Sequence, residues 1–227
     1  MWGIAVKAYF VVEGEATELF VYPEWIKNLK PELTIFSDYD DFASAKSGIY
    51  FVSGYGYPNI FKEIANAVKN INKIKNVDYF CVILDADEDD AKIREEAVKE
   101  VVITEKMVSH TNLEVVVQNR CFETFLLGNQ KCFSRQTTNE ELIKLIQYYD
   151  VLNNDPELMG NYSQDFTHSQ FHFKYAVTML REKRVRYTKS SCGAVAESSF
   201  YEALVQRIKS TTHLASFRRI NEILNKL

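Results

Sequence analysis

One stretch constrains the fold of this chain most: residues Val77 to Asp90 read V-D-Y-F-C-V-I-L-D-A-D-E-D-D. The part from Val77 to Leu84 is apolar and β-branched except for Asp78, which is typical of a strand buried on both faces of a sheet. The run then ends abruptly in acid, because five of the six residues from Asp85 onward are carboxylates. The sequence therefore predicts a buried strand with a strongly acidic carboxyl end.

The spacing within this acidic end favours a cation site. Asp85 and Asp87 are two residues apart, so in extended backbone past a strand their side chains leave on the same side and can converge on one hard cation. Glu88, Asp89 and Asp90 then open a helix, where the macrodipole favours negative charge. Helix capping alone also explains an acidic turn, and for an Asp-x-Asp pair taken by itself it is favoured over a metal site. Which of these last three acids faces a site stays open.

Strand-like and helix-like patterns alternate four times in the first part of the chain. Strands are expected at 4–12, weakly at 33–36, and at 49–53, 77–84 and 113–117, with helices at 19–29, 59–74 and 89–107 and a polar connector at 38–46. This order predicts an α/β fold with a mostly parallel sheet flanked by helices. In such sheets, ligands bind at the carboxyl ends of the strands.

A second acidic strand end follows the first predicted strand, in Glu13-Gly14-Glu15-Ala16-Thr17-Glu18. Gly14 suits a turn there because glycine tolerates φ > 0 and lets another group approach the backbone closely. Glu13 is expected at the same sheet edge as Asp85 and Asp87, and it can share a cation with them only if the strands are near neighbours. Gly54 and Gly56 precede another predicted helix and give a weak signal for phosphate binding.

The chain carries its charge unevenly. Its net charge is −4, but residues 1–130 hold 13 basic against 21 acidic residues, whereas residues 166–227 hold 11 basic against 4 acidic ones. Such asymmetry is compatible with a polyanionic substrate held near metal. We therefore divide the chain into a catalytic-looking part, 1–130, and a basic C-terminal extension, 131–227, with helices expected at 140–149, 169–186, 194–209 and 213–227.

The extension offers two sets of candidate side chains. A surface that follows the phosphates of nucleic acid is expected at Arg181, Lys183, Arg184, Arg186 and Lys189, with a solvated helix face as the equally weighted alternative. His168 and His172 are four residues apart and could share a helix face, but no third ligand accompanies them, so an ordinary polar or buried role is favoured over a metal site.

Length and composition bound the remaining classes. The 227 residues can bury a full core, and 46% hydrophobic with 26% charged residues is ordinary for a globular protein. The four cysteines lie far apart, which favours reduced, buried thiols over disulfides or a zinc site. No apolar run approaches a membrane span and no leader pattern opens the chain, so a cytoplasmic protein without membrane contact is expected.

The two acidic strand ends carry a family resemblance that covers roughly residues 1–130. Glu13-Gly14 followed by Asp85-x-Asp87 resembles the paired acidic motifs of the TOPRIM fold, found in topoisomerases, primases and OLD-family nucleases. Glu13-Gly14-Glu15-x-Thr17-Glu18 with Asn119-x-Cys121-Phe122-Glu123-x-x-Leu126-Leu127 is more closely similar to the RloB-like branch, which is linked to bacterial phage-defence loci. The chain departs from that branch at Gln118-Asn119-Arg120, where Ser-Asn-Pro is usual, and this departure affects the expected placement of Glu123.

The resemblance implies a Mg²⁺- or Mn²⁺-dependent nuclease that cleaves DNA or RNA, with transfer RNA among the candidate substrates, and a role in antiviral defence. It implies that Glu13 is a metal ligand or general acid/base and that Asp85 and Asp87 are metal ligands. Glu18 would be a further ligand or an acid that supports a ligand, and Glu123 an added carboxylate that suits a second metal position. It also suggests a lysine that stabilises the transition state, for which Lys174 and Lys189 are the candidates. Three or four carboxylates suit Mg²⁺ or Mn²⁺, which prefer oxygen ligands, and two ions could flank one phosphate.

A rival hypothesis is a non-catalytic, nucleic-acid-binding or regulatory subunit. Because the chain has no Gly-x-x-x-x-Gly-Lys-Ser/Thr motif of its own, such a subunit would work with a separate ATPase. The sequence leaves the oligomeric state, the number of metal ions and the need for an activating partner open.

Overall fold

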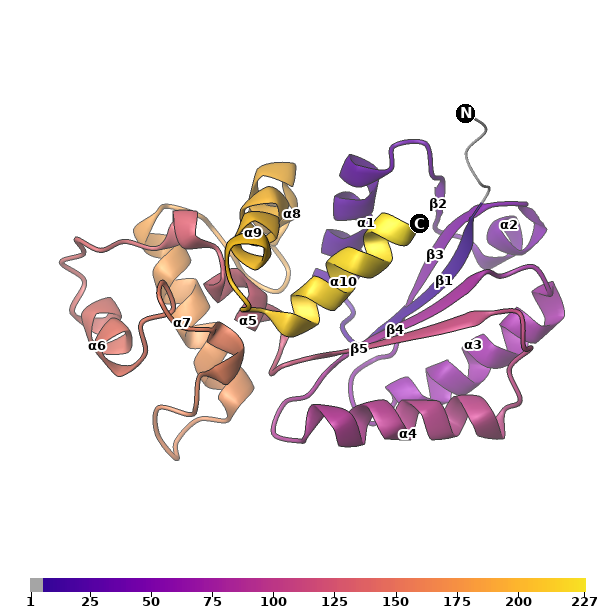
Figure 1. Ribbon diagram of the computed structural model, residues 1–227, viewed down its shortest axis with the longest axis horizontal. Helices are drawn as coiled ribbons and strands as arrows, with labels where there is room; N and C mark the ends of the chain where they lie inside the picture. Colours follow the sequence, from indigo (N-terminus) through magenta and orange to yellow (C-terminus); the bar gives the residue numbers. More distant parts are fainter. Residues whose placement is uncertain (1–5) are drawn as a thin grey trace.

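The computed structural model describes residues 6–227, and its centre is a sheet of five parallel strands (Figure 1). The strands are β1 (Lys7–Val12), β2 (Ile35–Phe36), β3 (Gly48–Ser53), β4 (Tyr79–Asp85) and β5 (Asn112–Gln118). Their spatial order is β2-β3-β1-β4-β5, with β1 paired to β3 on one side and to β4 on the other. The predicted α/β class with a parallel sheet flanked by helices is confirmed.

Each central strand is buried on both faces because its residues alternate between two apolar cores. In β1, Ala8, Phe10 and Val12 face one core, whereas Tyr9 and Val11 face the other. The strand β4 alternates in the same way, with Cys81 and Ile83 opposite Phe80, Val82 and Leu84. Apolar residues at every position, rather than at every second one, are what a sheet covered on both faces requires.

Helices on opposite faces supply the other side of each core. The helices α2 (Tyr39–Ser44), α3 (Ile60–Ile74) and α4 (Ala91–Thr104) pack on the Tyr9 face, and α1 (Thr17–Leu29) and α5 (Phe122–Leu127) pack on the Phe10 face. Figure 1 shows α3 and α4 below the sheet and α1 above it. The neighbouring strands β1 and β4 therefore send their connections to opposite faces, which opens a crevice between their carboxyl ends.

The C-terminal extension is helical, as predicted, and shares the Phe10-face core with the sheet. It contains α6 (Glu140–Tyr148), α7 (His168–Glu182), α8 (Gly193–Ala196), α9 (Ser198–Ser210) and α10 (Ala215–Lys226), with short 3-10 turns at Gln130–Cys132 and Pro156–Leu158. Trp25 of α1 lies against Tyr201 of α9 and Phe217 of α10. The helix α10 also covers the edge strand β5, where Arg219 and Lys226 pair with the buried Glu114.

Several predicted bounds are wrong. The connector at 38–46 contains α2, whose first turn is capped by the Asp38 side chain. The helix α7 ends at Glu182 rather than at Arg186, and the helix predicted at 194–209 is divided at Glu197, where the backbone is extended. Residues 4 and 5 of the first predicted strand lie outside the described residues. Within residues 6–227, none of the helices combines the length and apolarity needed to span a membrane.

Candidate active site

The carboxyl ends of β1 and β4 bring Glu13 against Asp85. Glu13 is 8% exposed, and its Oε2 accepts a hydrogen bond from the backbone N–H of Asp85 at 2.9 Å. The other carboxylate oxygen accepts from the N–H of Tyr57 at 3.2 Å, and the N–H of Gly56 donates to the Glu13 carbonyl. The strands are thus near neighbours, and the glycine turn after β3 holds Glu13, so the Gly56 and Tyr57 amides are already engaged and are not free for a phosphate.

Glu18 joins this edge from the first turn of α1, and Gly14 leaves it room. Glu18 is 6% exposed, and a Cβ added to Gly14 would overlap the Glu18 carboxylate. Gly14 is absent from the glycines with positive φ among the described residues. Of the two reasons expected for a glycine here, close approach of another group is the one that applies.

Asp85 is held by a chain of side chains from β5 and α1. Gln118 lies opposite Asp85 in the sheet register, and its Nε2 donates to Asp85 Oδ1 at 2.6 Å. The Tyr22 hydroxyl donates in turn to Gln118 Oε1 at 2.5 Å. Because both Gln118 and Tyr22 are fully buried, this chain fixes the rotamer of Asp85.

Glu123 reaches the same edge from α5. It is 3% exposed, and its Oε1 accepts a hydrogen bond from the Tyr187 hydroxyl at 2.7 Å. Thr124 closes the first turn of this short helix by accepting the N–H groups of Arg120 and Cys121. The unusual Gln118-Asn119-Arg120 segment therefore still delivers Glu123 to the site, and its glutamine orients Asp85.

Asp87 does not follow the extended path that the spacing predicted. Its φ is +50°, in the left-handed region, so its side chain does not repeat the direction of Asp85. Instead, Asp87 Oδ1 accepts a hydrogen bond from the Ser169 hydroxyl of α7 at 2.6 Å. Arg120 supports the turn by donating to the carbonyls of Asp87 and Asp89.

Burial and mutual repulsion raise the pKa values of these acids. Burial, followed by the charges of Glu123 and Glu13, raises the pKa of Glu18 to about 7. Burial and then the charges of Glu18, Glu13 and Glu123 hold the pKa of Asp85 well above its usual value. Burial also raises the pKa of Glu13, although the Asp85 N–H opposes that change. The folded chain thus crowds carboxylates whose charges oppose one another.

Two adjoining cavities open onto these carboxylates. The first, which we call the acidic cavity, has a volume of about 350 Å³ and is lined by Glu13, Glu18, Asp85, Glu123 and Lys189. The second, which we call the connecting cavity, has a volume of about 640 Å³ and shares Asp85, Glu123 and Lys189 with the first. As the side chains stand, residues 6–227 contain no group of three or more His, Cys, Asp or Glu that could hold a metal ion.

The rest of the acidic run and the histidines have other partners. Glu88 pairs with His168, the Asp90 side chain caps α4, and Asp89 lies 2.9 Å from Arg94. His172 is fully buried between Thr124 and the Met159 carbonyl. These contacts give both histidines the ordinary roles that the sequence favoured over metal binding.

The two candidate lysines differ in their surroundings. Partial burial would lower the pKa of Lys189, but the charges of Glu123, Asp85 and Glu18 raise it, so its ammonium group keeps its proton. Lys174 Nζ lies 3.0 Å from Glu141, although its side chain also lines the connecting cavity. Lys189 is therefore the lysine already placed among the carboxylates.

The basic residues predicted to follow phosphates gather where α7 ends. Arg181, Arg184 and Arg186 line a hollow of about 410 Å³, and Lys183, next to them, is exposed. Tyr187 and Lys189 continue from this turn into the acidic site. A cation surface and the carboxylates are thus joined by a few residues of backbone.

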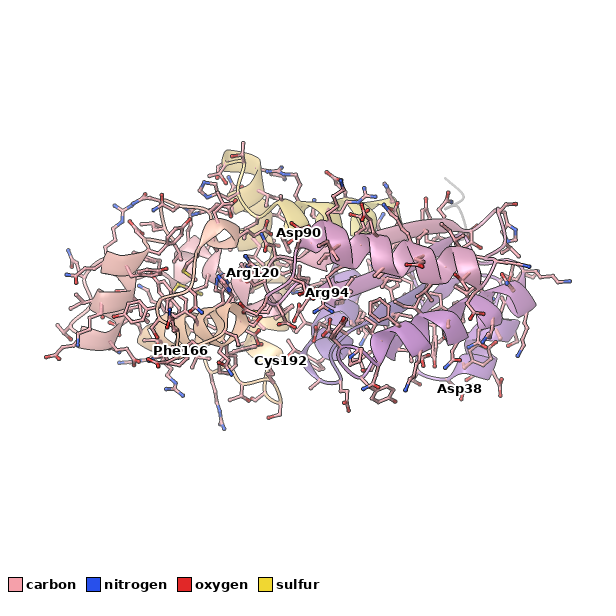
Figure 2. The ribbon with its side chains drawn as sticks, turned by 90° about the horizontal axis from the view of Figure 1, so that it is seen from below. Asp38, Asp90, Arg94, Arg120, Phe166 and Cys192 are labelled. Atoms are coloured by element: carbon pink, nitrogen blue, oxygen red, sulfur yellow. The ribbon has the colours of Figure 1, made fainter. Side chains whose placement is uncertain are left out.

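Sequence reasoning missed the residues that orient the acids, including Gln118, Tyr187 and Ser169. It also missed Arg94, which is 5% exposed and lies over the Tyr57 ring at 3.5 Å, and whose charge opposes the rise in the pKa of Glu13 that burial causes. Figure 2 shows Arg94 and Arg120 near the junction of the sheet and the extension. Gln118 could have been identified as a site residue, because it is a polar residue at the end of a predicted strand. Arg94 lies within a helix that carries many charged residues, so the sequence did not distinguish it from its neighbours.

Comparison of the chain with models of protein families, with curated proteins and with solved structures gave no match.

Proposed function

We propose that this protein is a metal-dependent nuclease that hydrolyses phosphodiester bonds at the acidic cavity. The observation that carries the proposal is the contact between Glu13 and Asp85 in the crevice between the carboxyl ends of β1 and β4. Glu18 and Glu123 are buried beside them. Ligands of open α/β sheets bind in this crevice. Buried acids with perturbed pKa values in a cleft are a sign of function rather than of stability.

The donor set fits Mg²⁺ or Mn²⁺ by its chemistry. Glu13, Glu18, Asp85, Asp87 and Glu123 offer oxygen ligands only, and hard dications prefer oxygen. A dication would also relieve the repulsion that raises the pKa values of Glu18 and Asp85. The carboxylates would have to turn toward one another to hold it, since no set of three converges as they stand in residues 6–227.

When bound, the metal ion would supply Lewis acidity and an attacking water of lowered pKa. The chain's own groups do the rest. Gln118 and the backbone amides of Asp85 and Tyr57 orient two carboxylates, and Tyr187 orients a third. The protonated Lys189 would place a positive charge beside the phosphate and stabilise the charge that develops there.

The proposed substrate is nucleic acid, either DNA or RNA. The hollow lined by Arg181, Arg184 and Arg186 suits phosphates on either side of the bond that is cleaved. The resemblance to RloB-like proteins is what suggests transfer RNA as one substrate and phage defence as the setting. An ATPase partner belongs to the rival hypothesis of a non-catalytic subunit.

Cleavage of plasmid, single-stranded DNA and total transfer RNA with Mn²⁺ tests the proposal. Wild type is expected to cut at least one substrate, and Glu13→Ala and Asp85→Ala to lose at least 100-fold of the rate. Glu24→Ala, on the outer side of α1, is the matched control and should retain activity. Activity that survives both site substitutions would refute the proposal, and binding without cutting by wild type would favour the non-catalytic subunit.

A further inference from the structure

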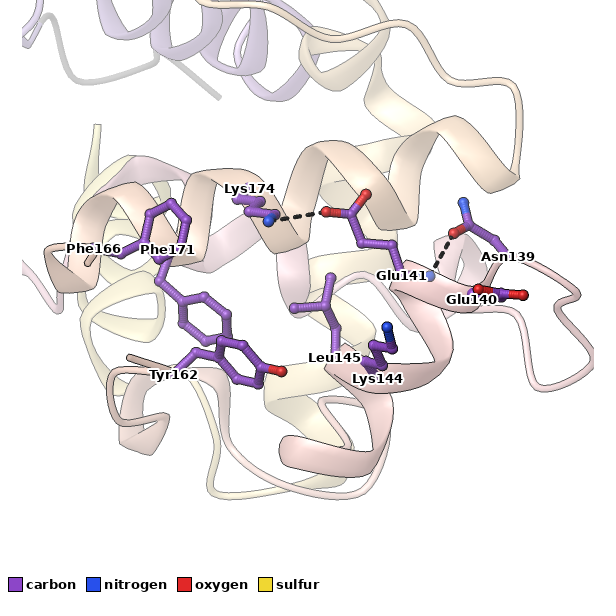
Figure 3. A pocket seen from close by; sticks show the side chains of 9 residues that line it. All are labelled: Asn139, Glu140, Glu141, Lys144, Leu145, Tyr162, Phe166, Phe171 and Lys174. Atoms are coloured by element: carbon purple, nitrogen blue, oxygen red, sulfur yellow. Dashed lines mark hydrogen bonds and ion pairs between the residues drawn. The ribbon is translucent and has the colours of Figure 1, made fainter. Parts of the chain in front are cut away.

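A third cavity lies inside the helical extension, next to the proposed catalytic edge. It has a volume of about 480 Å³, within the range of roughly 300–1,000 Å³ that small-molecule sites occupy. Tyr162, Phe166, Phe171 and Leu145 give it aromatic and apolar walls, and Lys144 and Lys174 lie at its rim (Figure 3). We call it the aromatic pocket.

The rings of this pocket are fixed by their packing. Tyr162 stacks on Phe171 with 5.5 Å between ring centroids and 12° between planes, and Tyr148 meets Tyr162 edge to face. Phe171 is fully buried, whereas Tyr162 is 46% exposed. Tyr162 is therefore an aromatic surface held from behind, with part of its area open to a ligand.

The rim carries charge of both signs, because Glu140 and Glu141 line the pocket together with Lys144 and Lys174. Lys174 Nζ lies 5.1 Å from the Phe166 ring centroid and 3.0 Å from Glu141, so the aromatic wall and the cation occur together. Aromatic faces stack on any base, and a nearby cation suits the phosphate attached to it.

The aromatic pocket adjoins the connecting cavity of the proposed catalytic site. Phe166 and Lys174 line both the aromatic pocket and the connecting cavity, which also holds Asp85 and Asp87. A strand with a phosphate at the carboxylates would therefore pass the Phe166 and Lys174 side chains to place a neighbouring base in the aromatic pocket.

We propose that the aromatic pocket binds an unpaired nucleobase of a single-stranded nucleic acid, close along the strand to the phosphodiester at the acidic cavity. The inference rests on the proposed function, which it deepens by naming the substrate class. Bases in a duplex are stacked and paired, and so cannot present a face to Tyr162 or Phe166 without leaving the helix. Single strands, loops and splayed ends present theirs freely.

Binding measured separately from cleavage tests this inference. The probes are a fluorescent single-stranded oligonucleotide and an abasic strand of the same length, titrated with Ca²⁺ present in place of Mn²⁺ and followed by anisotropy. The abasic strand keeps the phosphates and loses the bases. Tyr162→Leu and Phe166→Leu are expected to weaken binding of the intact strand about 5- to 100-fold and to leave the abasic strand within about twofold.

Phe20→Leu is the matched control, because Phe20 is also 46% exposed but lies on α1, away from this pocket. It should change neither affinity. Unchanged binding of the intact strand by both pocket variants, or an equal loss for both strands, would overturn the inference while leaving nuclease activity intact. If wild type cuts nothing with Mn²⁺ but the two pocket variants still lose affinity for the intact strand alone, the proposed function fails and the base-binding pocket stands.

Discussion

The Glu13 carboxylate accepts a hydrogen bond from the backbone N–H of Asp85, with 2.9 Å between Oε2 and N. The donor is main chain, so the contact depends on the neighbouring positions of β1 and β4 and on the rotamer of Glu13, but not on the rotamer of Asp85. It fixes one carboxylate at the base of the next one, in a place where burial raises the pKa of both.

Glu18→Gln is expected to stabilise the metal-free protein. The folded pKa of Glu18 is about 7, above the ordinary value of 4.5, so ionisation of Glu18 lowers stability as pH rises from 4.5 through 7. An uncharged amide removes that loss, and the free energy of unfolding at pH 8 should rise by about 1–3 kcal/mol. At pH 4.5 the difference should be close to zero. Urea denaturation at both pH values measures it.

The same substitution should reduce the increase in melting temperature caused by Mg²⁺ or Mn²⁺, because one oxygen ligand is lost. Glu24→Gln is the control, since Glu24 lies on the outer side of α1 and pairs with Lys27. A Glu18→Gln protein that is less stable than wild type at pH 8 would contradict the inference that the buried carboxylates repel one another. A variant that keeps the whole metal-induced increase in melting temperature would contradict a role for Glu18 as a metal ligand.

Gly14→Ala should disturb the site through Glu18 alone. The added methyl group overlaps the Glu18 carboxylate, so Glu18 must turn away from Glu13 and Glu123. We expect a smaller metal-induced increase in melting temperature and at least a tenfold loss of cleavage rate. Gly193→Ala provides the control, because a Cβ there would meet no described atom within 4 Å apart from its chain neighbours and the backbone of its own helix. If the two alanine variants show the same metal-induced increase in melting temperature and the same cleavage rate, the position of Glu18 beside Gly14 is not needed for metal binding or cleavage.

The sheet and its acidic edge could be predicted because both follow from local pattern. Continuous apolar runs such as Val77 to Leu84 require two covered faces, and strands that alternate with helices run parallel, so Glu13 and Asp85 had to share an edge. Their adjacency depended on strand order, which the sequence did not contain. Asp87 was misplaced because its left-handed backbone is fixed by contacts with Arg120 and Ser169, residues distant in the chain.

The end of α7 was harder to predict, because the motif that terminates this helix lacks its usual glycine. The helix α7 ends in a Schellman motif: the Val185 N–H donates to the Leu180 carbonyl and the Arg184 N–H to the Arg181 carbonyl. Glycine normally marks the left-handed position of this motif, but Arg184 occupies it with φ +58°. Without a glycine, the pattern predicted a helix through Arg186.

Arg184→Gly is therefore expected to stabilise the protein while weakening its binding to nucleic acid. Relief of the left-handed strain should increase the free energy of unfolding by about 0.5–1 kcal/mol. Loss of a cation from the hollow at the end of α7 should lower affinity and reduce the slope of log K against log [salt] by about 0.7–0.9 for one phosphate contact.

Lys75→Gly is a matched control for that variant. Lys75 ends α3 in the same left-handed conformation, with φ +66°, and is likewise exposed. Lys75→Gly should increase the free energy of unfolding by the same amount as Arg184→Gly. It should not change the slope of log K against log [salt] for nucleic-acid binding. If Arg184→Gly binds nucleic acid as wild type does, the basic turn is a solvated helix end and not a phosphate contact.

His172 should make stability fall as pH decreases. The Met159 carbonyl can only accept, so Nε2 of His172 carries the proton, and Nδ1 accepts from the Thr124 hydroxyl at 2.8 Å. A second proton would leave Nδ1 donating toward a hydroxyl that already accepts from Cys121, and burial lowers the pKa to about 4. Because this folded pKa is below the ordinary 6.5, the contribution of His172 is complete above pH 6.5 and is lost as pH falls toward 4.

His172→Gln isolates this effect, since glutamine can still donate to the Met159 carbonyl but does not titrate. Groups that titrate in both proteins cancel in the difference between wild type and variant. That difference in free energy of unfolding should decrease by about 2–3 kcal/mol between pH 7 and pH 4. His110→Gln, which replaces a histidine at an exposed turn, is the control substitution. Parallel stability curves for wild type and His172→Gln would mean that the buried ring accepts a second proton without cost, against the hydrogen-bond arrangement described.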